Sequence, residues 1–265
     1  MSIAGKTVAL IGSTGILGSE YVNFLSKNNV TLIIGDENIS RCNLLADQME
    51  KEGYARPETC RIDLYDEGSI VNFFKVIADN YKQLDTLINN AQVKPPGFYD
   101  SFENYTKETL MSVLDGNTVG MTLSCREACK IFLKQGKGNI INVASIYGLK
   151  AADQSLYDNV KNIYNPDERF SSPVSYAVSK AAVLHLTRYL ASYYRGKNIR
   201  VNTLTPGGVF DNHDDEFVSA YAKRNFLNRM ADRTDYNGAI EFLISDKSSY
   251  MTGANIVVDG GWTVA

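Results

Sequence analysis

The sequence predicts an α/β fold, in which a doubly wound parallel sheet of seven strands carries helices on both faces. Short runs rich in β-branched residues alternate with longer helical stretches along the chain. No proline-rich linker, low-complexity stretch or short-period repeat interrupts this alternation. Strands that alternate with helices form right-handed βαβ units and therefore a parallel sheet. We expect a single domain over residues 1–265.

Each strand is predicted from a short apolar run, and each helix from a longer interval between two such runs. The predicted strands are Thr7–Ile11, Val30–Ile34, Thr59–Ile62, Thr86–Asn89, Asn139–Val143, Ile199–Leu204 and Asn255–Val258. The clearest predicted helices are Gly15–Ser26, Ser69–Tyr81, Leu110–Lys134 and Ser175–Tyr194. Because neighbouring parallel strands need crossover connections, we expect helices in the remaining intervals as well.

Composition and charge exclude several classes of protein. With 265 residues and 44% hydrophobic content, the chain can bury a full core. A formal net charge of -3 gives no basic surface for nucleic acid. The N-terminal residues lack the basic start and apolar run of a signal peptide, and no apolar stretch approaches the roughly 20 residues that span a bilayer. We therefore expect a cytoplasmic protein with no nucleic-acid or membrane partner.

Cysteines and histidines are few and scattered. No CxxC pair occurs among the four cysteines, and the only histidines are His185 and His213. A zinc site needs ligands at short spacing, so we predict no metal site. Cys125 and Cys129 share a helical face and are expected to form a reduced, packed pair, while His185 is expected to pack or to cap a helix.

A glycine turn follows the first predicted strand and opens the first predicted helix. Glycines let the backbone approach a pyrophosphate, and the free N–H groups and positive dipole end of the helix attract the anion. This context predicts a Rossmann-like dinucleotide site. The turn residues expected to contact the cofactor are Gly12, Thr14, Gly15, Ile16, Leu17 and Gly18.

An acidic residue is expected at the end of the second strand. Asp36 lies 18 residues after Gly18, where a carboxylate can accept hydrogen bonds from an adenosine ribose and would repel a 2′-phosphate. Glu37 follows it, and the first arginine after it is Arg41. We therefore predict NAD as the cofactor and consider NADP less favoured. The alternative interpretation of Asp36 is an ordinary acid at a strand end.

Tyr176 and Lys180 are four positions apart in a predicted helix, so their side chains share one face. An ordinary tyrosine has a pKa of about 10, and a nearby cation stabilises its phenolate. We therefore expect Lys180 to lower the pKa of Tyr176 and to make it a general acid/base near neutral pH. The pair alone occurs by chance in many proteins. Its place after a glycine turn, an acid, Asn-Asn-Ala and a serine that follows a strand indicates a hydride-transfer enzyme.

With these motifs in this order, the chain closely resembles the short-chain dehydrogenase/reductase family over nearly its whole length. The resemblance implies that Tyr176 is the general acid/base, that Lys180 holds the nicotinamide ribose and tunes the phenol, and that Ser145 hydrogen-bonds the substrate oxygen. It implies that Asn117 holds a water for proton relay. Further cofactor contacts implied by the resemblance are Asp63, Leu64, Asn90, Ala91, Pro206, Gly207 and Val209. A homotetramer paired through the helices at 110–134 and 175–194 is also expected.

The chain departs from the pattern of the family's single-domain branch. Ile11 stands in place of the usual threonine, and Gln92 in place of the glycine that usually follows Asn-Asn-Ala. Gly15 stands one residue earlier than in that branch. The resulting Gly-xx-Gly-xx-Gly spacing is similar to that of the family's longer branch, which acts on nucleotide sugars. We do not expect the extra carboxyl-terminal domain of that branch.

The connection from Ser145 to Tyr176 is unusually long. It spans 31 positions, roughly 18 more than the single-domain branch has, which places an insert at about residues 149–172. A long loop beside an active site is often a lid or a specificity loop. Its polar residues, suited to polyhydroxylated or anionic ligands, are Lys150, Asp153, Gln154, Tyr157, Asn159, Lys161, Asn162, Tyr164 and Arg169. The alternative is a solvated excursion that covers a neighbouring subunit.

A second segment, at about residues 209–230, stands where the family places its substrate-closing loop. Its acidic residues are expected to be the N-terminal acids of a helix that starts near Asp214, or to make the loop mobile and solvated. Arg229 either faces the substrate or anchors the loop.

These observations predict an NAD-dependent oxidoreductase that exchanges hydride between nicotinamide and a secondary alcohol or ketone of a sugar, sugar acid or sugar-derived substrate. Two alternatives remain open. One is a nucleotide-sugar epimerase or dehydratase that retains its NAD, which the glycine spacing favours. The other is a non-catalytic NAD-binding sensor or scaffold, although such a protein does not need a phenol and an ammonium together.

Overall fold

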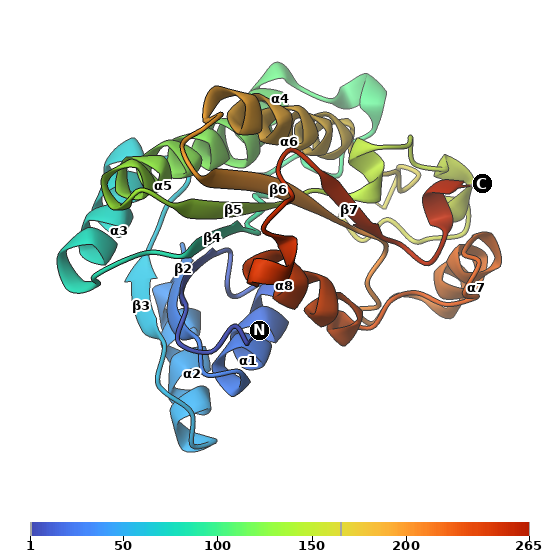
Figure 1. Cartoon of the computed structure of the whole chain (residues 1–265). Coiled ribbons are helices and arrows are strands. Elements are labelled where there is room, and N and C mark those ends of the chain that lie inside the picture. The colour runs from blue at the N-terminus through green and yellow to red at the C-terminus, as the bar shows by residue number, and fades with distance from the viewer. Residues whose placement is uncertain (1, 165, 265) are drawn as a thin grey trace.

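The computed structural model describes residues 2–164 and 166–264 and contains the predicted parallel sheet of seven strands (Figure 1). Met1 and Ala265, at the ends of the predicted domain, and Asn165, in the predicted insert, lie outside the described residues. The strand order is β3-β2-β1-β4-β5-β6-β7. The chain therefore starts in the middle of the sheet, winds outward to β3, and crosses back to β4, which makes the junction of β1 and β4 the point where the winding reverses.

The strands agree closely with the predicted ranges. They are β1 (Thr7–Ile11), β2 (Thr31–Asp36), β3 (Glu58–Arg61), β4 (Thr86–Asn89), β5 (Gly138–Val143), β6 (Ile199–Pro206) and β7 (Asn255–Val258). The α-helices are α1 (Ile16–Lys27), α2 (Ile39–Lys51), α3 (Glu67–Asn80), α4 (Lys107–Leu114), α5 (Met121–Gln135), α6 (Val174–Tyr193), α7 (Asp215–Arg224) and α8 (Asn237–Ile244). The main difference among the strands is that β2 ends at Asp36 itself, so that its carboxylate stands at the edge of the sheet.

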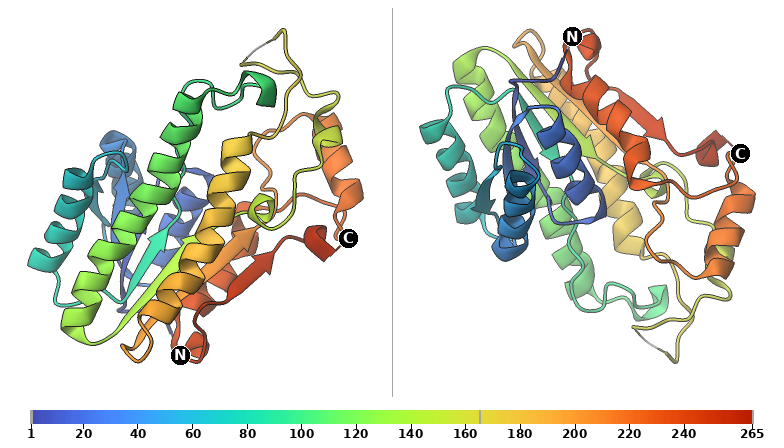
Figure 2. Two further views of the ribbon diagram at one scale, coloured as in Figure 1. Left: turned by 90° about the horizontal axis from the view of Figure 1, so that it is seen from above. Right: turned by 90° about the horizontal axis from the view of Figure 1, so that it is seen from below.

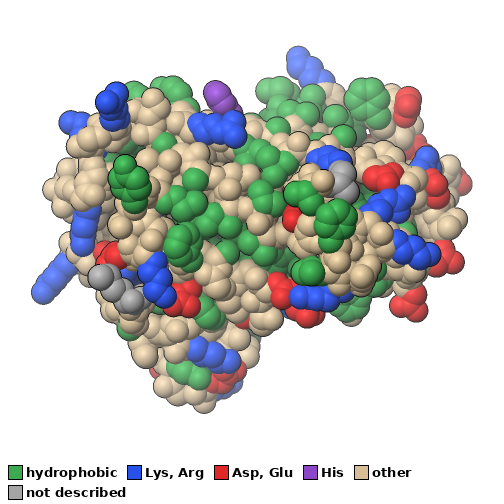
Figure 3. All heavy atoms as spheres, turned by 45° about the vertical axis from the view of Figure 1, so that its right-hand side comes forward, with side chains coloured by type: hydrophobic (Ala, Val, Ile, Leu, Met, Phe, Trp, Pro, Cys, Tyr) green, Lys and Arg blue, Asp and Glu red, His purple; other side chains and the backbone are tan. Residues whose placement is uncertain are grey.

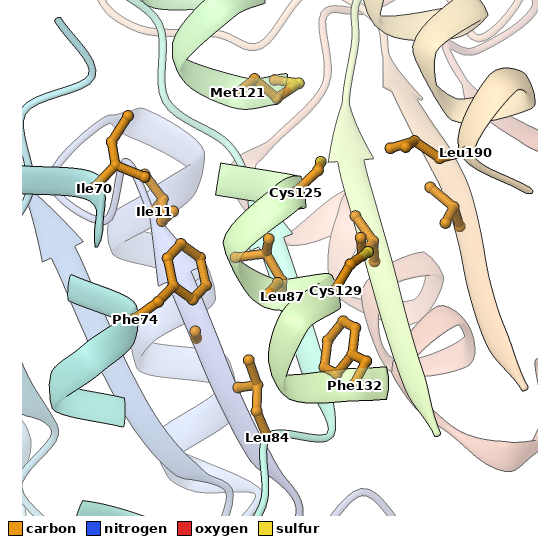
Figure 4. Packing of buried hydrophobic residues seen from close by; sticks show 14 of the residues in the cluster. Ile11, Ile70, Phe74, Leu84, Leu87, Met121, Cys125, Cys129, Phe132 and Leu190 are labelled. Carbon is orange, nitrogen blue, oxygen red and sulfur yellow. The ribbon is translucent and has the colours of Figure 1, made fainter. Parts of the chain in front are cut away.

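Helices cover both faces of the sheet, as predicted (Figures 1 and 2). Helices α3, α5 and α6 cover one face, and α1, α2 and α8 cover the other. Alternate residues of a strand point to opposite faces. In β1, Ala9 and Ile11 pack in the first layer, whereas Val8 and Leu10 pack in the second. In the first layer, side chains of the covering helices, such as Phe132 of α5, pack against the strands (Figure 4).

A third hydrophobic cluster lies beyond the carboxyl ends of the strands. It joins Leu156 and Tyr157 of the insert, Phe217 and Tyr221 of α7, and Trp262 near the carboxyl terminus. These segments lie together at the right of Figure 1. The insert is therefore packed against its own chain through buried side chains, and the interpretation as a merely solvated excursion does not hold for these residues.

The predicted helix at 110–134 differs from a single α-helix. It begins at Lys107, where the Thr106 side chain accepts a hydrogen bond from the N–H of Thr109, and a π-helical segment at Asp115–Gly120 separates α4 from α5. A Cβ added to Gly116 would lie 2.6 Å from Cγ1 of Val93, so the segment packs tightly on the chain that follows β4. A π-helical turn inside a helix often marks a functional site.

The surroundings of the cysteines and of His185 can be compared with the sequence-based expectations. Cys125 and Cys129 are free and buried, which confirms a packed pair. His185 is exposed on α6, so the expectation that it packs is wrong. Within residues 2–164 and 166–264, no group of three or more His, Cys, Asp or Glu side chains could hold a metal ion. No helix in this part of the chain is long and apolar enough to cross a membrane.

Candidate active site

A cavity of about 900 Å³ lies at the carboxyl ends of the strands. Its walls come from the segments that follow β1 to β6, and it spans the junction of β1 and β4. In open parallel sheets, ligands bind at this reversal of the winding. The cavity therefore stands where the fold itself places a ligand.

The cavity gathers almost all of the residues predicted for the site. Those that line it are Thr14, Ile16, Leu17, Gly12, Gly15, Asp36, Asp63, Leu64, Asn90, Ala91, Ser145, Tyr176, Lys180, Pro206, Gly207 and Val209. Gly18 and Asn117 are the two predicted residues that do not line it. Gly18 packs closely on the backbone of Gly12 and Ser13, and Asn117 hydrogen-bonds the segment after β4 and helix α6.

The three glycines of the first turn have different tasks. Gly12 has a φ of +82°, and a Cβ there would collide with the backbone of Ala91. A Cβ on Gly18 would collide with the carbonyl oxygen of Gly12. Gly12 and Gly18 are thus required by packing within the protein. A Cβ on Gly15 would meet nothing closer than 3.8 Å, so this position is open toward the cavity.

Helix α1 begins at this open glycine. Gly15 is its N-cap residue, and no side chain caps the first turn. The first N–H groups of the helix are therefore available to a ligand, and the helix dipole favours an anion there. This uncapped helix end, the open Gly15 and the cavity volume fit the pyrophosphate of a dinucleotide.

Asp36 is held firmly at the edge of this wall. Its Oδ2 accepts a hydrogen bond from the N–H of Thr14 at 3.1 Å, and its Oδ1 accepts one from the N–H of Asn38 at 3.2 Å. Glu37 and Arg41 line the cavity beside it. The carboxylate thus stands where an adenosine ribose would lie if the pyrophosphate bound at α1.

Three side chains meet at the opposite end of the cavity. Tyr176 and Lys180 come from α6, and Ser145 follows β5. Lys180 donates a hydrogen bond from Nζ to the carbonyl oxygen of Val143 at 2.9 Å, and this Nζ lies 5.8 Å from the centroid of the Tyr176 ring. Ser145 lies beside Tyr176, close enough to lower the pKa of its phenol. A phenol, a hydroxyl and an ammonium are therefore within reach of one substrate oxygen.

The pKa values of the pair differ from the sequence-based expectation. Burial raises the pKa of Tyr176, because it penalises the phenolate, and the hydrogen bond with Ser145 opposes this rise. The expectation of a lowered pKa is therefore wrong for this arrangement, since Nζ of Lys180 is directed to Val143 and not to the phenol oxygen. Burial also lowers the pKa of Lys180 to about 8.

Asn117 lies in the π-helical segment and is buried. Its Oδ1 accepts a hydrogen bond from the N–H of Val93 at 2.8 Å, and its Nδ2 donates one to Oγ of Ser179 at 3.2 Å. Both ends of the side-chain amide are thus engaged by the protein. The side chain ties the segment after β4 to α6, and it positions both of them against the cavity.

Aromatic residues line the cavity around Tyr176, and the prediction named only Tyr157 among them. The hydroxyls of Tyr147 and Tyr157 lie 3.1 Å apart, and the ring of Tyr157 stacks on that of Phe217 with centroids 5.5 Å apart. Other lining residues at this end are His213, Tyr221 and Met230. A sequence signal was present, because Phe217 and Tyr221 are four positions apart on α7, but the spacing alone does not say what they face.

The polar residues of the insert mostly hold the insert in place. Asp153 forms an ion pair with Arg224 of α7 at 2.6 Å, and Arg169 pairs with Asp158. Of the nine polar residues named for ligand binding, all of them described, only Tyr157 lines the cavity. The expectation that this mixture of charges faces a ligand is therefore wrong, since none of its charged residues lines the cavity and Asp153 and Arg169 form ion pairs within the protein.

The segment at 209–230 contributes to the same wall. Helix α7 starts at Asp215, next to the N-cap position Asp214, and carries Asp215 and Glu216 in its first turn, which confirms the expected helix start. Arg229 forms an ion pair with Asp235 at 2.6 Å and does not line the cavity. Of the two interpretations of this arginine, the structure supports the anchor.

Comparisons with known proteins agree with this geometry. The sequence model of the family described as "Enoyl-(Acyl carrier protein) reductase" matches residues 14–263. The chain is 30% identical to post-translational flagellin modification protein A of Campylobacter coli, over 98% of this chain and 99% of that protein.

Two solved structures are similar over nearly the whole chain. One is a short-chain dehydrogenase from Leptospira borgpetersenii with bound NAD+, which has 31% identity and a TM-score of 0.84, and the match covers 98% of this chain and 93% of that one. The other is a putative NAD(P)-dependent gluconate 5-dehydrogenase from Beutenbergia cavernae with bound NADP, which has 26% identity and a TM-score of 0.85, and the match covers 100% and 99% of the two chains. The chain belongs to the short-chain dehydrogenase/reductase family, whose members are oxidoreductases that use nicotinamide cofactors.

Proposed function

We propose that the protein is an NAD-dependent oxidoreductase that exchanges hydride between nicotinamide and a secondary alcohol or ketone of a sugar, sugar acid or sugar-derived substrate. One observation carries this proposal. Ser145, Tyr176 and Lys180 converge at one end of a cavity whose other end is formed by the uncapped α1 and Asp36. A dinucleotide that binds at α1 would extend toward the three side chains.

The mechanism assigns one task to each residue. A bound nicotinamide dinucleotide would supply or accept the hydride. Ser145 hydrogen-bonds the substrate oxygen and polarises it. Tyr176 donates the proton to that oxygen during reduction and removes it during oxidation. Lys180 provides a buried positive charge and a donor for the nicotinamide ribose. Asn117 holds a water for proton relay, while its side chain keeps the wall in position.

The walls near Tyr176 support a hydroxylated, sugar-like substrate. Aromatic faces pack against the C–H groups of a sugar, while the hydroxyls of Tyr147 and Tyr157 can hydrogen-bond its hydroxyl groups. The similar Beutenbergia protein is described as a putative gluconate 5-dehydrogenase, which agrees with this class. The description of the family model favours a second candidate, a ketone or enoyl group carried by an acyl thioester.

NAD is the proposed cofactor, with NADP less favoured. The support is Asp36, whose carboxylate faces the place of the ribose and would repel a 2′-phosphate. Glu37 adds a second negative charge to the same wall. Arg41 lies on this wall as well and is the side chain that would favour NADP.

We further propose a cytoplasmic homotetramer. The four cysteines are free, as expected for a reducing compartment. The helices expected to pair subunits expose large hydrophobic side chains, namely Met111, Leu133, Val178, Tyr189 and Tyr193. Figure 3 shows hydrophobic side chains in patches among lysines and arginines on one face of the molecule. Light scattering tests the assembly, because the mass of a single chain in solution would contradict it.

The first experiment follows absorbance of NADH while the protein is screened against sugar alcohols, sugar acids, nucleotide sugars and acyl thioesters with NAD and NADP. The Tyr176→Phe variant should lose about 100- to 10,000-fold in kcat, the usual contribution of a general acid/base. Tyr250→Phe is the control, since Tyr250 is fully exposed and does not line the cavity, and this variant should leave kcat unchanged. Turnover that survives in Tyr176→Phe would refute the mechanism.

A panel without turnover would be informative as well. If the purified protein then contained tightly held NAD, a retained-cofactor epimerase or dehydratase, or a non-catalytic sensor, would replace the proposal. Turnover of the acyl thioester alone would favour the second candidate.

A further inference from the structure

The segment that follows β4 forms one wall of the cavity at the catalytic end. Residues Gln92, Val93, Lys94, Pro95 and Pro96 all line the cavity. The segment is held by the hydrogen bond from the N–H of Val93 to Asn117 and by the close packing of Val93 on Gly116. Two consecutive prolines follow Lys94 and restrict the backbone. Lys94 therefore extends from a fixed support.

A group of aromatic rings links Lys94 to the catalytic end of the cavity. Its Nζ lies 5.7 Å from the centroid of the Tyr99 ring. The Tyr99 ring stacks on Tyr164 of the insert with centroids 4.0 Å apart, which fixes its place. The Tyr99 ring also lies 5.5 Å from that of Phe170, which in turn lies 5.4 Å from the ring of Tyr157 on the cavity wall. The aromatic face holds the ammonium without neutralising its charge.

The charges along the cavity are separated by sign. The carboxylates that line it are Asp36, Glu37 and Asp63, and all of them lie at or just after the carboxyl ends of β2 and β3. Around Tyr176, the described lining residues include no carboxylate. Lys94 forms no ion pair within residues 2–164 and 166–264. The other lysine at this end, Lys180, is buried against Val143.

We propose that Lys94 pairs with an acidic group of the substrate, a carboxylate or a phosphate. This inference rests on the proposed function and adds a specificity-determining residue to it. An exposed cation that faces a cavity without a carboxylate partner can form a charge-assisted hydrogen bond with an anionic ligand. The insert residues Lys150, Lys161 and Arg169 do not supply this charge, because none of them lines the cavity. The acidic substrate is thus recognised by the segment after β4 and not by the insert.

The test compares three probes that share a carbon chain: D-gluconate, D-glucitol 6-phosphate and the neutral D-glucitol. Binding is measured by calorimetry in the presence of saturating NADH, because an alcohol does not react with the reduced cofactor. The variants are Lys94→Met and Lys94→Arg. The matched control is Lys161→Met, which removes an exposed lysine of the insert that does not line the cavity.

The wild type should bind at least one acidic probe more tightly than D-glucitol. In Lys94→Met, the affinity for that acidic probe should fall about 10- to 100-fold, which corresponds to one charged hydrogen bond, while the affinity for D-glucitol should change less than about twofold. Lys94→Arg should retain most of the preference, and Lys161→Met all of it. Loss on the gluconate arm identifies a carboxylate, and loss on the phosphate arm a phosphate ester.

The inference would be overturned if the wild type bound acidic and neutral probes with equal affinity. It would also be overturned if Lys94→Met lost the same affinity for all three probes. A weaker affinity of Lys94→Met for NADH would assign the lysine to the cofactor and would contradict the inference as well. Because binding is measured without turnover, failure of the inference differs from failure of the proposed function. Turnover with no effect of Lys94→Met contradicts only the inference. An intact effect of Lys94→Met on binding, without turnover on any substrate, contradicts only the proposed function.

Discussion

The two ends of the cavity are built in different ways. At the cofactor end, the turn between β1 and α1 is shaped by backbone contacts, since Gly12 and Gly18 each stand where a Cβ would strike main-chain atoms. At the substrate end, the wall is made of side chains from the insert, α7 and the segment after β4. A wall made of backbone imposes residue types on a short stretch of sequence. A wall made of side chains depends on which distant segments pack together.

Two glycine variants in the turn between β1 and α1 give the clearest test of this difference between the two ends. Gly18→Ala should lower the free energy of unfolding by about 2–3 kcal/mol, because its Cβ would strike the carbonyl oxygen of Gly12. Gly15→Ala should leave stability nearly unchanged, since its Cβ has room, but it should weaken NAD binding by filling the place of the phosphate. Urea unfolding and calorimetry measure the two quantities. Equal stability losses in both variants would contradict the assignment of tasks to the glycines.

At the substrate end, Tyr157→Ala removes a large side chain from the third cluster, where it is 8% exposed. Loss of a buried aromatic side chain should cost about 3 kcal/mol of unfolding free energy. KM for the substrate should rise, while the affinity for NAD stays unchanged, because the two walls have separate supports. Ile163→Ala, at an insert position that is 71% exposed, is the control and should do neither. An equal loss of NAD affinity in Tyr157→Ala would show that the two ends are coupled.

A smaller effect is expected from Asp36→Ala. Removing the carboxylate removes both the acceptor for the ribose and the repulsion of a 2′-phosphate. The ratio of kcat/KM with NAD to that with NADP should fall about tenfold, equivalent to the loss of one hydrogen bond to a charged group. Steady-state kinetics with both cofactors measure the ratio, and the control is Asp47→Ala, which removes a partly exposed α2 carboxylate that pairs with Arg56 and does not line the cavity. An unchanged ratio would remove the basis for preferring NAD.

The smallest effect expected is on the pH profile. The raised pKa of Tyr176 keeps the phenol protonated through neutral pH, as ketone reduction requires. Lys180 is charged below its pKa of about 8 and loses its charge as pH rises through that value. The rate of reduction should therefore fall by about half near pH 8 and further above it. In Lys180→Arg this decline should move to higher pH, and a decline at the same pH would assign it to another group.

Much of the site could be predicted from the sequence because it depends on local rules. Asp36 follows the glycine turn at the distance that one helix and one strand require, and the structure places both on one cavity wall. Tyr176 and Lys180 share a helical face, so their proximity follows from helix geometry. The rise of the Tyr176 pKa could not be predicted from the sequence. The spacing of Tyr176 and Lys180 says nothing about burial or about the hydrogen bond that directs Lys180 to Val143.

By itself, the sequence determined the order of strands and helices along the chain, the shape of the turn at α1 and the proximity of Tyr176 to Lys180, since each depends on neighbours within a few positions or on one crossover. The tertiary structure alone decided what the insert does. Its charges pair with Arg224 and with one another, and its aromatic residues pack on α7. It also decided that Lys94 stands at the catalytic end of the cavity, away from the carboxylates. Such pairings join residues far apart in the chain, and no local pattern in the sequence encodes them.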